Sequence, residues 1–192
     1  MGRVGKSMFI QTERTPNPAT LKFLPGEAVM SSGTADFRDV ESAERSPLAR
    51  RLFQVEGVTG VFFGGDFVSV SKADDAEWQT LKPVILGVIM EHFVAGHPLL
   101  LDDAAQTAEE AADDGADAEI VGQIKELLDT RVRPAVAQDG GDIIYRGFQN
   151  GIVMLQLQGS CQGCPSSTMT LKMGIENMLK HYIPEVVEVR AV

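Results

Sequence analysis

The feature that most constrains the fold of this chain is an acidic, alanine-rich stretch near its middle. Residues 102–119 carry eight Asp or Glu residues and no Lys or Arg. The alanines between the acids form no apolar stripe, so the stretch cannot bury enough surface to offset the entropy of ordering it. Repulsion between its like charges would keep the stretch extended. The alternative is a solvated helix, since Ala and Glu favour helices. Either form separates two domains, expected at residues 8–97 and 117–192, with an acidic flexible linker at 98–116.

The net charge of −10 over 192 residues is concentrated in this stretch. Outside it, 19 acidic and 17 basic residues remain, so the two domains are close to neutral. No basic patch indicates nucleic acid or an anionic membrane surface. No run reaches the roughly 18 apolar residues of a membrane span. We therefore expect neither nucleic acid nor a membrane as a partner.

The N-terminus and the cysteine content favour a reducing compartment. Residues 1–7 lack the apolar core of a secretory signal and are short for an organellar transit peptide. Two cysteines in a chain of this size do not form a disulfide scaffold, and in a reducing compartment a Cys pair is typical of metal binding or catalysis. We expect a bacterial cytoplasmic location, with the mitochondrial matrix as the less favoured alternative.

The first domain alternates short strands and helices. Thr15-Pro16-Asn17-Pro18 is turn-prone, Ser46-Pro47 is typical of a helix start, and Gly64-Gly65-Asp66 favours a hairpin. Apolar residues recur at helical spacing from Trp78 to Phe93 and predict a core helix. The expected elements are strands 8–13 and 20–24, helix 47–55, strands 58–63 and 67–71, and helix 78–93. This ββαββα order indicates a small α+β domain.

The second domain has the order αββαβ. Pro134 is expected to kink or end its first helix, and Asn150-Gly151 is a strong hairpin signal. The expected elements are helix 120–128, strands 143–148 and 152–157, helix 165–182 and strand 186–189. The apolar side of helix 165–182 is expected to comprise Met169, Met173, Ile175, Met178 and Leu179. The fold class is therefore α+β, with two small α+β domains.

The two cysteines of the chain, Cys161 and Cys164, lie between a predicted strand and a predicted helix. Pro165 at the first helical position makes Cys164 the N-cap, where unpaired N–H groups and the helix dipole favour the thiolate. The pair suits a redox disulfide or half of a metal site, because iron–sulfur clusters and structural zinc take four ligands. His92 and His97 lie in the other domain and are expected to be structural, and His181 is expected to be a surface or helix-end residue.

Three functions are compatible with this pair alone. They are an iron–sulfur cluster carrier, a thiol–disulfide oxidoreductase, and a zinc site that holds a dimer together. Two chains that each contribute Cys161 and Cys164 across a two-fold axis give four thiolates most economically.

Longer stretches of the sequence resemble a known family. Asp139-Gly140-Gly141-Asp142, the segment Gly159-Ser160-Cys161-Gln162-Gly163-Cys164-Pro165-Ser166-Ser167 and residues 171–176 resemble the C-terminal domain of NifU and the Nfu proteins. Residues 11–23, QTERTPNPATLKF, resemble the Nfu N-terminal domain. The matches cover nearly the whole chain outside the linker.

The resemblance implies a scaffold or carrier of iron–sulfur clusters that is not an enzyme. Cys161 and Cys164 would be the cofactor-binding and metal ligands, and no residue would be catalytic. The cluster, [4Fe–4S] favoured over [2Fe–2S], would bridge two protomers of a homodimer and pass to apo client proteins. Upstream cluster-assembly factors are the other partners that the resemblance implies.

Overall fold

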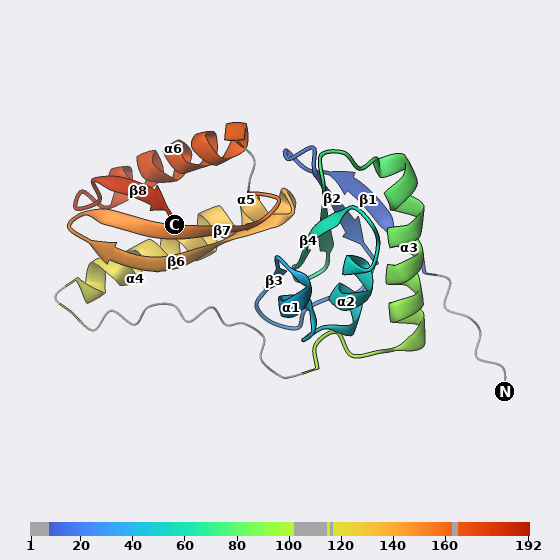
Figure 1. The fold of residues 1–192 in the computed structure, drawn as a ribbon. Coiled ribbons are helices and arrows are strands. Elements are labelled where there is room, and N and C mark those ends of the chain that lie inside the picture. Colours follow the sequence, from blue (N-terminus) through green and yellow to red (C-terminus); the bar gives the residue numbers. More distant parts are fainter. Residues whose placement is uncertain (1–7, 102–114, 116, 163–164) are drawn as a thin grey trace.

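A computed structural model of the chain describes residues 8–101, 115, 117–162 and 165–192 (Figure 1). It contains two separate β-sheets, each packed with helices around its own apolar core, which confirms the α+β class. Most of the predicted linker lies outside the described residues, and so does Cys164.

The N-terminal half forms a five-stranded antiparallel sheet with the order β1-β2-β5-β4-β3. The helices α2 and α3 pack on one face of this sheet, over a core that includes Phe23, Phe37, Phe63, Ile85 and Ile89. The elements are β1 Gln11–Arg14, β2 Thr20–Leu24, β3 Ala35–Phe37, α1 Val40–Ala43, α2 Pro47–Phe53, β4 Val58–Phe63, β5 Val68–Lys72 and α3 Trp78–Ala95.

The start of α2 follows the sequence prediction. Ser46 is its N-cap and accepts a hydrogen bond from Ala49 N at 3.1 Å, and Pro47 occupies the first turn. The strand β3 and the helix α1 were not predicted. They span three and four residues, too few to show a period, and α1 depends on a capping box between Asp39 and Ser42.

The C-terminal half forms a three-stranded sheet with the order β6-β7-β8, in which β6 and β7 form an antiparallel hairpin and β8 runs parallel to β7. Its core lies between the sheet and the helices, around Ile124, Ile143, Leu155 and Leu179. The elements are α4 Ala118–Leu127, the π-helical turn η1 Leu128–Val132, α5 Arg133–Gln138, β6 Gly141–Gln149, β7 Ile152–Gly159, α6 Pro165–Tyr182 and β8 Glu188–Ala191.

Pro134, which was expected to kink or end the first helix, follows a change from α-helix to π-helix. The chain leaves α4 at Leu127, passes through η1, and continues as α5 to Gln138. Proline has no N–H to donate and its ring crowds the preceding turn, so a wider π-helical turn just before it relieves the conflict. The helical segment therefore reaches the turn at Asp139 and Gly140, here called the double-glycine turn, which leads into Gly141 and β6.

The predicted apolar side of α6 is wrong at two positions. Ile175 and Leu179 are buried, whereas Met169 and Met173 are 68% and 58% exposed. Ile175 and Leu179 are four residues apart and share one face of the helix, and Met169 and Met173 share another face by the same spacing. The sequence spacing alone did not show which of these two faces meets the sheet.

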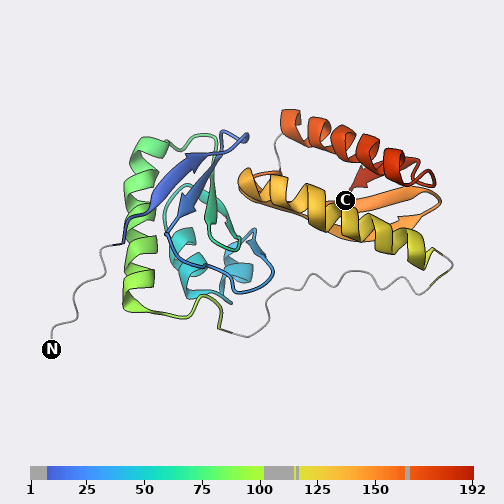
Figure 2. The ribbon, with the colours of Figure 1, turned by 180° about the vertical axis from the view of Figure 1, so that it is seen from behind.

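The two halves are in contact in this structure. Strand β7 lies against β4 and β5, on the face of the N-terminal sheet that the core does not use. Figures 1 and 2 show α3 on the side of that sheet remote from the C-terminal half. The end of the β6–β7 hairpin at Gly141 and Gly159, which leads to Cys161, therefore points at the N-terminal sheet.

Candidate metal-binding loop

Residues 159–162, here called the cysteine loop, run from the last residue of β7 toward α6. Cys161 is buried, with 7% of its surface exposed, and belongs to the apolar core of the C-terminal half. Helix α6 begins at Pro165, as the sequence predicted. Cys164 lies outside the described residues, so its place at the N-cap stays a prediction.

Glycines allow the cysteine loop to lie directly on the turn before β6. A Cβ added at Gly141 would be 2.7 Å from Gln158 O and 2.8 Å from Cys161 Sγ. At Gly159, which has a positive φ of 64°, an added Cβ would be 2.6 Å from Gly140 O. These separations are too short for real Cβ atoms, so the packing around Cys161 depends on the absence of side chains.

Hydrogen bonds fix the backbone on both sides of Cys161. The Ser160 hydroxyl donates to Asp139 O, and Thr168 Oγ1 of α6 donates to Cys161 O at 3.2 Å. Within the loop and its turn, Ser160 N donates to Gly140 O at 3.2 Å and Gln162 N donates to Gly159 O at 3.1 Å. The position of Cys161 is therefore set by the double-glycine turn and by the first turns of α6.

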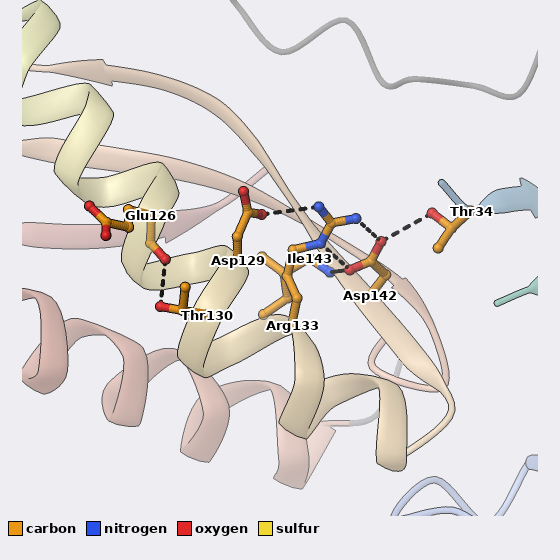
Figure 3. A network of polar contacts seen from close by, with 7 residues as sticks. All are labelled: Thr34, Glu126, Asp129, Thr130, Arg133, Asp142 and Ile143. Atoms are coloured by element: carbon orange, nitrogen blue, oxygen red, sulfur yellow. Dashed lines mark hydrogen bonds and ion pairs between the residues drawn. The ribbon is translucent and has the colours of Figure 1, made fainter. Parts of the chain in front are cut away.

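An ion pair anchors the double-glycine turn to the preceding helix (Figure 3). Arg133 donates through Nε to Asp142 Oδ1 and through Nη2 to Asp142 Oδ2, both at 2.9 Å, and through Nη1 to Asp129 at 3.1 Å. Asp142 also accepts from Ile143 N at 2.8 Å and from Thr34 Oγ1 at 3.0 Å. The hydrogen bond from Arg133 to Asp142 is the main reason why the pKa of Arg133 is raised.

The sequence did not predict this ion pair. An Asp beside a glycine turn commonly bonds to the local backbone, and the bond that Asp142 accepts from Ile143 N is of that kind. Its partner Arg133 is nine residues earlier, across the turn. The only hint of the pair in the sequence is an Arg at the start of a short helix followed by an Asp at the start of a strand. Such a pattern is too common to predict an ion pair.

The three histidines do not gather around the cysteine loop in this structure. His92 is buried in α3, where burial is the main cause of its lowered pKa, followed by the neighbouring His97. His181 lies in the last turn of α6. Among the described residues, no group of three or more His, Cys, Asp or Glu side chains is arranged to hold a metal ion. Within the same residues, no helix is long and apolar enough to span a membrane.

Comparisons with known proteins identify both halves. The family described as "Scaffold protein Nfu/NifU N terminal" matches residues 10–96, and the NifU-like domain family matches residues 124–190. Both halves are therefore domains of scaffold proteins. The chain belongs to the Nfu/NifU family of iron–sulfur cluster scaffold proteins.

Individual relatives support the assignment over nearly the whole chain. NifU-like protein 4, mitochondrial, of Arabidopsis thaliana is 54% identical over 188 residues, which cover 97% of this chain and 66% of that protein. The NFU1 iron-sulfur cluster scaffold homolog, mitochondrial, of Drosophila erecta has the same identity and coverage. The solution NMR structure of a NifU-like protein from Saccharomyces cerevisiae covers 54% of this chain and 92% of its own, with 24% identity and a TM-score of 0.48. A likeness of that extent adds nothing to the assignment.

The expected bacterial cytoplasmic location is contradicted by these relatives. Proteins that match this chain at 54% identity carry the word mitochondrial in their names. This finding favours a mitochondrial protein, the location that we expected less from the sequence. The cysteine content used for the location does not distinguish two reducing compartments.

Proposed function

We propose that Cys161 and Cys164 of two chains together bind one iron–sulfur cluster, of the [4Fe–4S] type, and that the protein passes it to apo client proteins. The observation that carries the proposal is the close packing of the cysteine loop on the glycines before β6. It places Cys161 in direct contact with the turn at Gly141 and leaves no room there for any side chain. The chain has two cysteines, whereas a cluster takes four thiolates, so a second copy completes the ligand set.

The residues around the cysteine loop would hold the cluster as cargo. The Thr168 hydroxyl and the turn at Gly140 fix the backbone on either side of Cys161, so the thiolate direction depends on a small number of backbone contacts. Thiolates are the preferred ligands of iron–sulfur clusters, and hydrogen bonds and burial around the sulfurs tune their stability. No residue of the loop has to act as an acid or base for this function.

We further propose that the two domains, at residues 8–97 and 117–192 with the acidic linker between them, have different functions. The N-terminal domain would recognise client proteins or upstream assembly factors. Its outermost helix, α3, exposes Val84, Met90 and Val94 by 49%, 41% and 63%, and apolar side chains of this kind suit protein contacts. Replacing the three by Ser should slow transfer to a client and leave iron uptake unchanged. Unaltered transfer to every client tested would contradict this role.

Single substitutions of the cysteines test the main proposal. Cys161→Ser or Cys164→Ser leaves a dimer with two thiolates, and a serine oxygen is a poor substitute for a soft thiolate ligand. After anaerobic reconstitution with iron and sulfide, each variant should stay folded, lose bound iron and acid-labile sulfide, and lose the associated dimer. Met169→Ser, on the exposed face of α6, is the control for a change beside the loop that removes no thiol.

The assay separates the three functions left open by the sequence. A zinc site would bind zinc with no sulfide, and a thiol–disulfide oxidoreductase would act without any metal. Both of these also need the thiols, so iron, sulfide and client activation have to be measured together. A Cys164→Ser protein that keeps a stable cluster and activates an apo-enzyme at the wild-type rate would contradict the proposal.

A further inference from the structure

The face of the N-terminal sheet opposite its core is buried against the cysteine loop. Lys22 of β2, Ser69 of β5 and Phe62 of β4 are neighbours in the strand register and are 7%, 2% and 1% exposed. Phe62 is not part of the core of its own half. Its ring lies over Gly159, where an added Cβ would be 3.1 Å from the ring carbon Cδ1. The C-terminal domain thus covers part of this face.

Two side chains of the N-terminal domain donate hydrogen bonds to the backbone around Cys161. Asn17 Nδ2 donates to Ser160 O at 3.2 Å and to Gln162 O at 3.3 Å, the carbonyls on either side of the cysteine. Ser69 Oγ donates to Gly140 O at 2.7 Å, in the turn on which the loop lies. Asn17 is 8% exposed, and its Oδ1 is fixed by Ala19 N at 3.0 Å. The amide is therefore held in position by its own turn.

We propose that the N-terminal domain, through Asn17 and Ser69, holds the cysteine loop closed with the Cys161 thiol buried, and that this contact opens before the loop takes up or releases a cluster. The inference rests on the proposed function, since it assigns a regulatory contact to the same loop. A sulfur that bridges to a second chain has to reach the surface, and Cys161 is 7% exposed in the closed arrangement.

The chemistry of the contact suits a reversible closure. Apart from the packing of Phe62 on Gly159, it consists of the hydrogen bonds of Asn17 and Ser69 to carbonyls, a bond from Lys22 Nζ to Gln138 O at 3.3 Å and one between Thr34 and Asp142. Contacts between domains of one chain resemble transient protein interfaces and permit relative motion unless they are large and hydrophobic. A client or assembly factor that binds the N-terminal domain more tightly in the open arrangement would shift the equilibrium toward opening.

Two variants remove the contact while sparing the local structure. Asn17→Asp is nearly isosteric and keeps the oxygen that accepts from Ala19 N, but it puts a negative oxygen against two carbonyls. Ser69→Ala removes the donor to Gly140 O. Asn150→Asp is the matched control. It makes the same charge change at the opposite end of the β6–β7 hairpin, at a φ of 52° that Asp tolerates.

The experiment measures how fast iodoacetamide alkylates Cys161 in reduced, metal-free, full-length protein. A Cys164→Ser background leaves Cys161 as the only thiol of the chain. Circular dichroism establishes that each variant is folded. Buried thiols react only on opening, so Asn17→Asp should raise the rate about tenfold or more and Ser69→Ala by a smaller factor. Asn150→Asp should react at the wild-type rate.

The proposal is overturned if folded Asn17→Asp and Ser69→Ala both react at the wild-type rate. If Asn17→Asp does not fold, the rate of Ser69→Ala decides alone. Iron uptake by the protein with both cysteines separates this inference from the proposed function. If the protein takes up iron but the variants show unchanged alkylation rates, only the proposed closure of the loop is contradicted. If the variants are alkylated faster but the protein takes up no iron and sulfide, only the proposed cluster function is contradicted.

Discussion

The single hydrogen at the Gly141 side-chain position decides how closely the cysteine loop approaches the β6 turn. An alanine methyl there would stand 2.7 Å from Gln158 O and 2.8 Å from Cys161 Sγ. A carbonyl in a strand is backbone and cannot turn aside. We expect Gly141→Ala to displace Cys161 and to lower the free energy of unfolding of the C-terminal domain by about 1–3 kcal/mol, the usual cost of overpacking.

The measurement for Gly141→Ala is urea unfolding followed by circular dichroism, together with iron uptake after reconstitution. Gly122→Ala is the matched control, because no heavy atom lies within 4 Å of a Cβ added there and the residue is in the middle of α4. Alanine in a helix should stabilise it by about 0.5–1 kcal/mol. A Gly141→Ala protein as stable as Gly122→Ala, with full iron uptake, would show that the close approach is unimportant.

His92 makes the N-terminal domain sensitive to acid. Neither ring nitrogen has a hydrogen-bond partner among the described residues, and burial lowers the pKa below its ordinary value of 6.5. The unfolded chain therefore binds a proton more readily than the folded one, so stability is lost as the pH falls below about 6.5 and is fully present above it.

Replacing His92 by Phe should reduce this pH dependence. Trp78, the only tryptophan of the chain, lies at the start of α3 and reports on the unfolding of this domain by fluorescence. Between about pH 7.5 and pH 5.5, the free energy of unfolding should fall less in His92→Phe than in the wild type. Equal losses in the two proteins would mean that another group is responsible.

At the scale of elements, the pair of Arg133 and Asp142 joins α5 to the first residues of β6 and so fixes the turn under the cysteine loop. The Asp142 side chain is 5% exposed and the Arg133 side chain 34%, so solvent screens the pair only in part. Arg133→Ala removes two hydrogen bonds to a buried carboxylate. It should lower the free energy of unfolding by about 2–3 kcal/mol, given the usual strength of bonds to charged groups.

The control for Arg133→Ala is Arg190→Ala, whose bond to Glu188 is 3.4 Å long and lies between side chains that are 55% and 39% exposed. Pairs of this kind contribute about 0.5 kcal/mol or less. Chemical unfolding of both variants gives the comparison. If the two losses are equal, the buried pair does not stabilise the turn more than a surface pair does.

The elements themselves were largely predictable because local signals determine them. Asn150-Gly151 gives the β6–β7 hairpin, with positive φ at both residues, and Pro165 begins α6. The partners across the fold were not predictable in the same way. The turn around Asn17 was expected, but its amide bonds to carbonyls 143 and 145 residues further along the chain. No local pattern specifies such a contact.

At the scale of the whole molecule, two sheets that each have a core meet through a largely polar surface. The polar side chains of that surface include Asn17, Ser69 and Asp142, which are buried and each bond to a group of the other domain. Buried polar groups are stable when they are hydrogen-bonded, and these groups are. The arrangement keeps the region around Cys161 in contact with the domain that we propose recognises clients.

The central claim is that two chains share one cluster through Cys161 and Cys164. The most direct test is anaerobic reconstitution with iron and sulfide, followed by iron counting and the measurement of mass in solution. We predict about two irons per chain, from four irons held by the thiolates of two chains. The particle should have about twice the 20.7 kDa mass of one chain. Four irons per chain in a particle with the mass of one chain would contradict the claim.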